Sequence, residues 1–291
     1  MSFKVREVPA DDLVISLRSE WADTTKRPFV RGGTAFVPVK ENYPSEGLLS
    51  PRSPYQGRGY YMIGRIALIR GKKPSGEELA ELTGWQKPQG VLWVKSLDGE
   101  ERIPDTELLY GTAGDVIHRE TGFQYLLDPS KVMFSQGNRL EKVRMAARTR
   151  AGERVADMFA GIGYFSIPIA RAGAFVHAMD INPVAYGYLV ANARLNHVET
   201  NLIPECGDCR SLLSGVYDRI VMGHFNAPAM VPDTLLHVHS GTELHIHSSG
   251  KVPPDIGGLI RDAGYDPVIT VRTVKKTGPD RRHFVQDVVL G

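Results

Sequence analysis

The sequence has few cysteines and no long apolar run. Cys206 and Cys209 are its two cysteines among 291 residues, so no disulfide framework can hold the fold together. No apolar stretch reaches the roughly 20 residues that a membrane-spanning helix needs. The first residues, MSFKVREVPADDL, carry charges throughout and lack the apolar core of a signal peptide. We therefore expect a cytoplasmic protein with no membrane partner.

A strong excess of one charge is also missing. The net charge is only +2, so a nucleic-acid-binding function must come from how the charges are distributed. Apolar residues make up 42% of the chain and charged residues 23%, which is typical of a globular protein. A chain of this length can form two domains.

The stretch from Glu153 to Pro183 predicts the centre of the fold. An apolar run ends in Ala160-Gly161-Ile162-Gly163, a helical segment follows, and a second apolar run ends at Asp180. This pattern is typical of a βαβ unit. Gly161 and Gly163 allow a tight turn, the helix N-terminus directs N–H groups toward a ligand, and Asp180 is placed to hold ribose hydroxyls.

A complete dinucleotide motif is absent, because Ser166 stands where G-x-G-x-x-G requires its third glycine. The pattern therefore favours a smaller nucleoside ligand. Asp157-Met158-Phe159-Ala160-Gly161-Ile162-Gly163, Asp180-Ile181-Asn182-Pro183 and Gly207-Asp208-Cys209-Arg210 together resemble the S-adenosylmethionine site of a class I methyltransferase, an α/β Rossmann-like fold. The resemblance implies that Asp157 and Phe159 border the methionine part, Asp180 and Ile181 the ribose, and Asp208 and Cys209 the adenine. A glycine-rich turn without a ligand is the alternative.

The N-terminal third differs from the rest of the chain in its sequence pattern. We expect a small α+β domain over 1–110 before a catalytic domain over 111–291. Its expected strands include 34–39, 60–69 and 90–95, with a helix over 77–82. Between Gly47 and Gly76 there are six basic residues and no acids: Arg52, Arg58, Arg65, Arg70, Lys72 and Lys73. Three tyrosines lie among them. Such a stretch suits RNA, and a solvated surface explains it equally well.

The segment from Lys131 to Arg148 predicts a helix over 138–148 with Ser135 as its N-cap. Lys142 and Arg144 would then bring positive charge to a carboxylate of the ligand. A surface helix with ordinary ion pairs is the alternative.

The string F-S-x-G-N-x-x-E-K-x-R, followed by D-M-F-A-G-I-G-Y-F-S and D-I-N-P-x-A, resembles the family that modifies the purine 3′ of the anticodon in tRNA. The resemblance covers about residues 100–250 well and the N-terminal third loosely. It implies that tRNA is the partner and S-adenosylmethionine the group donor. It also places Ser135, Lys142, Asp180, Asp208 and Cys209 at the cofactor, and Glu141 and Arg102 at positions tied to catalysis, with Glu141 as a candidate general base.

That family has two branches, and two positions separate them. The branch that methylates guanosine N1 has S-P-R-L where this chain has Ser135-Gln136-Gly137-Asn138, and N-L-P where it has Gly223-His224-Phe225. Both departures match the branch that transfers a 3-amino-3-carboxypropyl group to C7 of 4-demethylwyosine during wybutosine synthesis. We therefore predict that activity, with guanine-N1 methylation as the runner-up. An RNA-binding protein that holds the cofactor without catalysis is the third possibility, and absent turnover on precursor tRNA would favour it.

The C-terminal part predicts strands over 198–204, 218–222 and 243–247, helices over 231–238 and 253–263, and a closing hairpin over 268–290. Cys206 and Cys209, and the pairs His237/His239 and His245/His247, have spacings that zinc sites use. A single C-x-x-C lacks its partner pair, so we predict no metal site. We expect a monomer.

Overall fold

A computed structural model describes residues 2–31, 33–49, 55–99, 101–135 and 138–291. The chain forms two compact units, Met1–Gly57 and Arg58–Gly291. The predicted boundary after residue 110 falls inside the second unit. The reason is tertiary, because Ile63, Leu68 and Leu92 share one apolar core with Val155 of the nucleotide-binding part.

The first unit is a small antiparallel sheet in the order β2-β3-β1-β4. Its strands are β1 (Phe3–Pro9), β2 (Phe29–Arg31), β3 (Thr34–Pro38) and β4 (Gly47–Leu49), with the short helix α1 (Leu13–Ser16) after β1. Val5, Ala35 and Val37 are buried in this unit. The strand predicted over 34–39 is confirmed.

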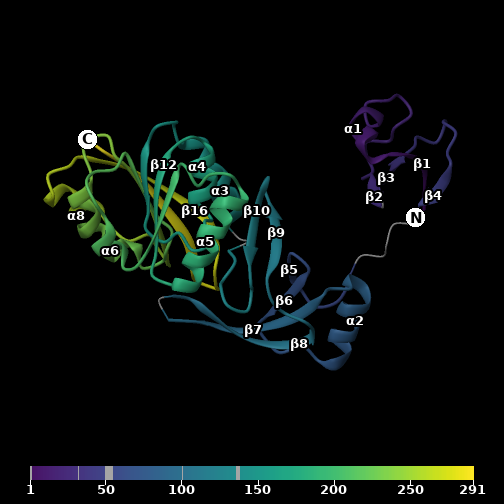
Figure 1. The fold of residues 1–291 in the computed structure, drawn as a ribbon, viewed down its shortest axis with the longest axis horizontal. Coiled ribbons are helices and arrows are strands. Elements are labelled where there is room, and N and C mark those ends of the chain that lie inside the picture. Colours follow the sequence, from purple (N-terminus) through teal and green to yellow (C-terminus); the bar gives the residue numbers. More distant parts are fainter. Residues whose placement is uncertain (1, 32, 50–54, 100, 136–137) are drawn as a thin grey trace. The chain divides into compact units, whose positions relative to one another are not determined.

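The second unit begins with a four-stranded sheet and one helix (Figure 1). These are β5 (Tyr61–Ile63), β6 (Ile66–Arg70), α2 (Gly76–Gln86), β7 (Gly90–Asp98) and β8 (Ile103–Gly111). The single strand predicted over 60–69 is wrong: β5 and β6 form a hairpin that turns at Gly64, which has φ +54°. Ser75 and Glu78 form a capping box at the start of α2.

The hairpin of β9 (Val116–Glu120) and β10 (Phe123–Leu127) leads to α3 (Arg139–Arg148). The helix is where the sequence predicts it, but its N-cap is Asn138 rather than Ser135. Gln136 and Gly137 lie outside the described residues.

The main sheet has seven strands in the order β13-β12-β11-β14-β15-β17-β16. Five are parallel: β11 (Arg154–Asp157), β12 (Phe175–Asp180), β13 (Leu202–Cys206), β14 (Arg219–Met222) and β15 (Glu243–Gly250). The predicted closing hairpin, β16 (Pro267–Lys276) and β17 (Arg282–Leu290), is antiparallel. The chain order reverses beside β11, and ligands of open α/β sheets bind at the carboxyl ends of strands at such a point.

Helices cover both faces of this sheet, because successive side chains of a strand point to opposite faces and both faces bury apolar residues. Val155 and Val221 pack in one core with α3, α4 (Ser166–Arg171) and α5 (Pro183–Leu195). Ala156 and Ile220 pack in the other core with α6 (Cys209–Leu212), α7 (Val231–Thr234) and α8 (Gly257–Asp262). The helix predicted over 231–238 is shorter, since α7 passes into a 3-10 turn, η4 (Leu235–His237). No helix among the described residues is long and apolar enough to cross a membrane.

Candidate active site

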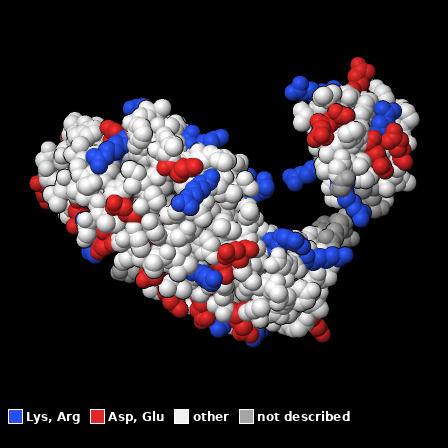
Figure 2. Space-filling view, in the orientation of Figure 1, with Lys and Arg blue, Asp and Glu red and all other residues white. Residues whose placement is uncertain are grey.

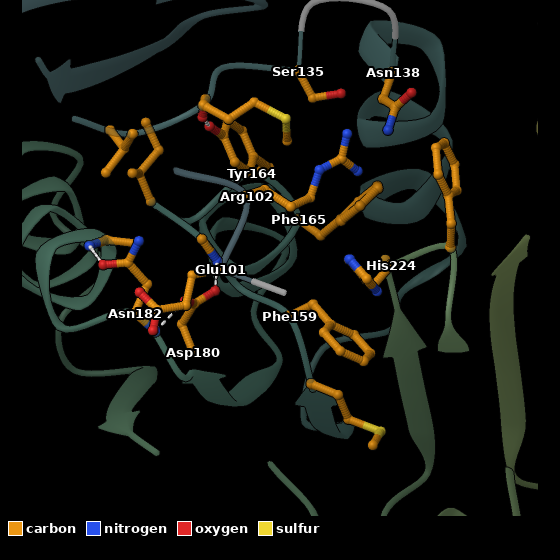
Figure 3. A pocket seen from close by; sticks show the side chains of 18 of the residues that line it. Glu101, Arg102, Ser135, Asn138, Phe159, Tyr164, Phe165, Asp180, Asn182 and His224 are labelled. Carbon is orange, nitrogen blue, oxygen red and sulfur yellow. Dashed lines mark hydrogen bonds between the residues drawn. The ribbon is translucent and has the colours of Figure 1, made fainter. Parts of the chain in front are cut away.

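A cavity of about 720 Å³ lies at the carboxyl ends of β11, β12 and β14. Figure 3 shows Asp180 and Asn182 on one side of it, Phe159 and His224 on another, and Ser135 with Asn138 at a third edge. Of the sequence-predicted site residues, the cavity lining includes Arg102, Ser135, Lys142, Phe159, Gly161, Asp180, Ile181, Asp208 and Cys209. Asp157, Gly163 and Glu141 do not line it.

The glycine turn and Asp180 form one hydrogen-bonded unit. The Gly161 N–H donates to Asp180 Oδ2 at 2.7 Å, and the Asn182 N–H donates to Asp180 Oδ1 at 2.9 Å. Gly161 has φ +56°, and a Cβ there would lie 2.7 Å from Tyr164 Cε2. Burial raises the pKa of Asp180. A carboxylate accepts about four hydrogen bonds, so Asp180 can still accept bonds from a ligand.

Asp157 lies on the buried side of the glycine turn, outside the cavity lining. Its side chain is fully buried and accepts a hydrogen bond from the Ser166 hydroxyl at 2.6 Å. Burial raises the pKa of Asp157 to about 6. Ser166 replaces the third glycine of the dinucleotide motif, and its hydroxyl supplies the partner that this carboxyl group needs. Gly163 has φ +101°, and a Cβ there would lie 2.5 Å from Ile167, so it keeps the turn close to α4.

The third strand-end acid, Asp208, caps α6 by accepting the Arg210 N–H at 3.0 Å. Hydrogen bonds from the Arg210 guanidinium lower the pKa of Asp208. Cys209 follows and is buried, and burial raises the pKa of its thiol to about 11. The thiol is therefore neutral near pH 7. Phe159 stacks on His224 with ring centroids 5.3 Å apart.

Lys142 lies at the cavity wall, but its charge already has a partner. The ammonium donates to Glu120 Oε1 at 2.7 Å and lies 4.5 Å from the centre of the Phe134 ring and 4.9 Å from that of Tyr164. Burial lowers the pKa of Lys142. The ammonium group has three donors, so the pair with Glu120 leaves contact between Lys142 and a ligand carboxylate as a prediction.

Glu141 belongs to a buried network away from the cavity lining. Its carboxylate accepts Arg144 Nε at 2.8 Å, and Arg144 Nη1 donates to Asp287 Oδ2 at 2.6 Å. Asp287 also bonds the His245 ring at 2.6 Å. This geometry favours a structural role for Glu141 and Arg144 over contact with a ligand.

Arg102 does line the cavity. It lies in the turn between β7 and β8 with φ +53°, and its guanidinium lies 5.4 Å from the centre of the Phe225 ring. Phe225 and Arg70 were singled out from the sequence only as part of a branch-specific motif and of the basic stretch, and Lys275 was not singled out; all three line the cavity. Arg70 and Lys275 come from β6 and β16, and no local motif links these strands to Asp180.

The histidines of the two H-x-H pairs have different partners. His247 bonds His283 at 2.9 Å, while His239 approaches Asp218 at 3.2 Å. Within the described ranges, no group of three or more His, Cys, Asp or Glu side chains is arranged to hold a metal ion.

The described basic residues of the stretch between Gly47 and Gly76 have different surroundings. Arg58 donates to the Arg70 carbonyl at 3.2 Å, Lys73 pairs with Glu107, and Arg70 lines the cavity. Arg52 lies outside the described residues. Figure 2 shows basic and acidic side chains interspersed over the visible face of the second unit.

Comparisons with known proteins point to one family. The family described as the TRM5/TYW2 methyltransferase domain matches residues 116–255. A Methanocaldococcus jannaschii protein named tRNA(Phe) (4-demethylwyosine(37)-C(7)) aminocarboxypropyltransferase is 40% identical over 172 residues, which cover 58% of this chain and 68% of the relative. The crystal structure of M. jannaschii TYW2 in complex with AdoMet has a TM-score of 0.66 and 30% identity, over 80% of this chain and 99% of the other. That of Trm5b from Pyrococcus abyssi has a TM-score of 0.71 and 26% identity, over 99% of both chains.

Proposed function

The chain belongs to the TRM5/TYW2 family, and we propose that it transfers the 3-amino-3-carboxypropyl group of S-adenosylmethionine to C7 of 4-demethylwyosine in tRNA(Phe). This nucleotide is the modified guanosine 3′ of the anticodon, and the reaction belongs to wybutosine synthesis. The observation that carries the proposal is the 40% identity to the M. jannaschii aminocarboxypropyltransferase. The family predicted from the sequence motifs is thereby confirmed.

The cavity residues fit S-adenosylmethionine. A volume of about 720 Å³ lies within the usual range for small-molecule sites. Asp180, fixed by two backbone N–H groups, would hold the ribose, while Asp208 and Cys209 would border the adenine. Ser135 and the Lys142–Glu120 pair would border the methionine part. When bound, the cofactor supplies an electrophilic carbon and a thioether leaving group.

The protein decides which carbon of the donor meets the attacking base, because transfer requires alignment with the breaking bond. Gly223, His224 and Phe225 line the cavity where the methylating branch carries N-L-P. A Cβ at Gly223 would lie 3.1 Å from Phe165 Cε2, so the glycine keeps space open at that wall. Arg102 is placed to steady the base or its phosphate.

Guanine-N1 methylation remains the runner-up, because the similarity to the P. abyssi Trm5b structure extends over 99% of both chains. We also propose that the first unit contributes to tRNA binding and that the enzyme acts as a cytoplasmic monomer. Incubation with precursor tRNA and labelled S-adenosylmethionine separates the two reactions. Aminocarboxypropyl transfer carries label from the carboxyl carbon into tRNA, whereas methyl transfer carries label only from the methyl carbon.

A further inference from the structure

Three basic side chains from three distant parts of the sequence converge on the cavity. Arg70 ends β6, Arg102 lies in the β7–β8 turn, and Lys275 lies near the end of β16. Arg70 is exposed, whereas Arg102 and Lys275 are half-buried. The group, which we call the basic rim, therefore runs from solvent into the cavity.

Two other cations of the lining differ from the basic rim in having acidic partners, whereas Lys276, which also lines the cavity, has no ion pair among the described residues. Lys142 pairs with Glu120, and Arg210 pairs with Asp208. Among the residues that the structure describes, neither Arg70, Arg102 nor Lys275 forms an ion pair with an acid. Arg70 Nε donates to the Tyr61 hydroxyl at 3.0 Å, and Arg102 lies over the Phe225 ring. Glu101 also lines the cavity, but among the described residues it forms no ion pair with the rim, so no acid pairs directly with these three cations.

The three cations are close enough to repel one another. Burial lowers the pKa of Arg102, and Arg70 lowers it further. Burial also lowers the pKa of Lys275, with further contributions from Arg70 and Arg102. Burial, Lys275 and Arg102 together lower the pKa of His283 to about 4, so this histidine stays neutral. An anion at the rim would relieve this repulsion.

Backbone irregularities orient two members of the rim. Arg102 has the left-handed φ of +53°, which side chains other than glycine rarely adopt. The pairing of β16 with β17 shifts register between Thr273 and Lys275, so the strand is irregular where Lys275 lies. Bulges redirect side chains and occur often beside active sites. Both irregularities place a cation at the same cavity.

We propose that Arg70, Arg102 and Lys275 bind a phosphodiester of the RNA strand that flanks the nucleotide inserted into the cavity. The proposal rests on an RNA substrate, as in the proposed function. An enzyme that reacts with a base takes that base out of the stack, so the flanking backbone must lie at the cavity entrance. Guanidinium and ammonium groups are the usual donors to phosphate oxygens. The exposed position of Arg70 favours a strand at the surface over the buried carboxylate of the cofactor.

The first test measures binding of an anticodon stem–loop RNA to the full chain at several salt concentrations. Lys275→Gln should lower the affinity and reduce the slope of log K against log salt by about 0.7–0.9. Arg272→Gln is the matched control, because Arg272 lies on the same strand, is exposed and does not line the cavity. Affinity for S-adenosylmethionine, measured by calorimetry, should be unchanged in both variants, which also shows that they are folded.

The second test uses RNA in which one methylphosphonate replaces a charged phosphate. Neutralising a linkage beside the target nucleotide should weaken binding to the wild type more than to Lys275→Gln, whereas a neutral linkage in the stem should affect both equally. Equal losses at every linkage, or a Lys275→Gln slope equal to that of Arg272→Gln, would overturn the proposal. Weaker binding of S-adenosylmethionine with unchanged RNA binding would assign the rim to the cofactor. Neither measurement depends on which group is transferred, so failure of the proposed function would be recognised separately.

Discussion

The Asp180 carboxylate accepts the Gly161 N–H at 2.7 Å and so joins the end of β12 to the glycine turn that follows β11. One side chain thereby fixes the turn and borders the cavity. Its loss would remove bonds to the ligand and also loosen the turn that borders the ligand. We therefore expect a larger effect on ligand binding than on folding.

Asp180→Ala should weaken S-adenosylmethionine binding by about 1.5–3 kcal/mol, since it removes charge-assisted hydrogen bonds to the ligand and loosens the Gly161 turn. Calorimetry gives the affinity, and thermal unfolding monitors the fold. Glu199→Ala, an exposed site outside the lining, is the control. If Asp180→Ala binds as tightly as the control, Asp180 does not hold the ligand.

Glu141→Gln should destabilise the protein and leave the pH–rate profile unchanged. The substitution removes the negative charge and one of the two oxygens that accept from the Arg144 guanidinium in a buried network, at a cost of about 1–3 kcal/mol. Urea unfolding measures the free energy, and initial rates over a pH series test catalysis. Loss of the acid limb of the profile in a variant that remains folded would restore Glu141 as a general base.

Ionisation of Asp157 should make the protein less stable as the pH rises from the unfolded-state pKa of this residue to its folded-state pKa. Its pKa is raised from about 3.8 in the unfolded chain to about 6 in the folded protein, so the folded state binds the proton more tightly. This contribution is complete below about pH 3.8 and is lost as the pH approaches and passes 6.

The comparison variant is Asp157→Asn, which keeps an oxygen to accept the Ser166 hydroxyl and cannot titrate. Relative to wild type, it should gain on the order of 2–3 kcal/mol of unfolding free energy between pH 4 and pH 7. The difference between the two proteins cancels other groups, such as Glu243, whose pKa is lowered to about 2 by hydrogen bonds from Arg219 and Arg148. A constant difference across this range would show that Asp157 ionises normally.

Local sequence patterns predicted the parts of the site that lie close together in the chain. The glycine turn and the strand-end acids Asp180 and Asp208 follow from βαβ periodicity, because parallel strands bring their carboxyl ends to one edge. Burial could not be inferred in this way. Asp157 resembles the other two acids in the sequence, yet it lies beneath the turn rather than in the cavity.

The features that were not predicted depend on contacts between residues far apart in the chain, which local sequence patterns do not reveal. Lys142 pairs with Glu120 of the preceding hairpin, and no local sequence pattern links these two residues. The sheet of β5 to β8 shares the core of the nucleotide-binding part. The boundary between the two compact units therefore lies after residue 57, whereas the sequence predicted it after residue 110. Arg70 and Lys275 reach the cavity through tertiary structure alone.

The choice of transferred group depends on the cavity wall near Gly223. Gly223→Asn should impair transfer strongly, because its Cβ would lie 3.1 Å from Phe165 Cε2 and its amide would extend into the cavity. Ser248→Ala, buried on β15 outside this lining, is the control. The second branch-specific position, Gly137, lies outside the described residues, and we expect the double change with Gly137→Arg to impair transfer further.

The central claim is tested most directly by identifying the nucleoside that the wild-type enzyme releases from S-adenosylmethionine with precursor tRNA. Aminocarboxypropyl transfer leaves methylthioadenosine, and methyl transfer leaves S-adenosylhomocysteine. We predict a tRNA-dependent methylthioadenosine peak on chromatography, equal in amount to the modified nucleoside. A dominant tRNA-dependent S-adenosylhomocysteine peak would contradict the account and assign the enzyme to the methylating branch.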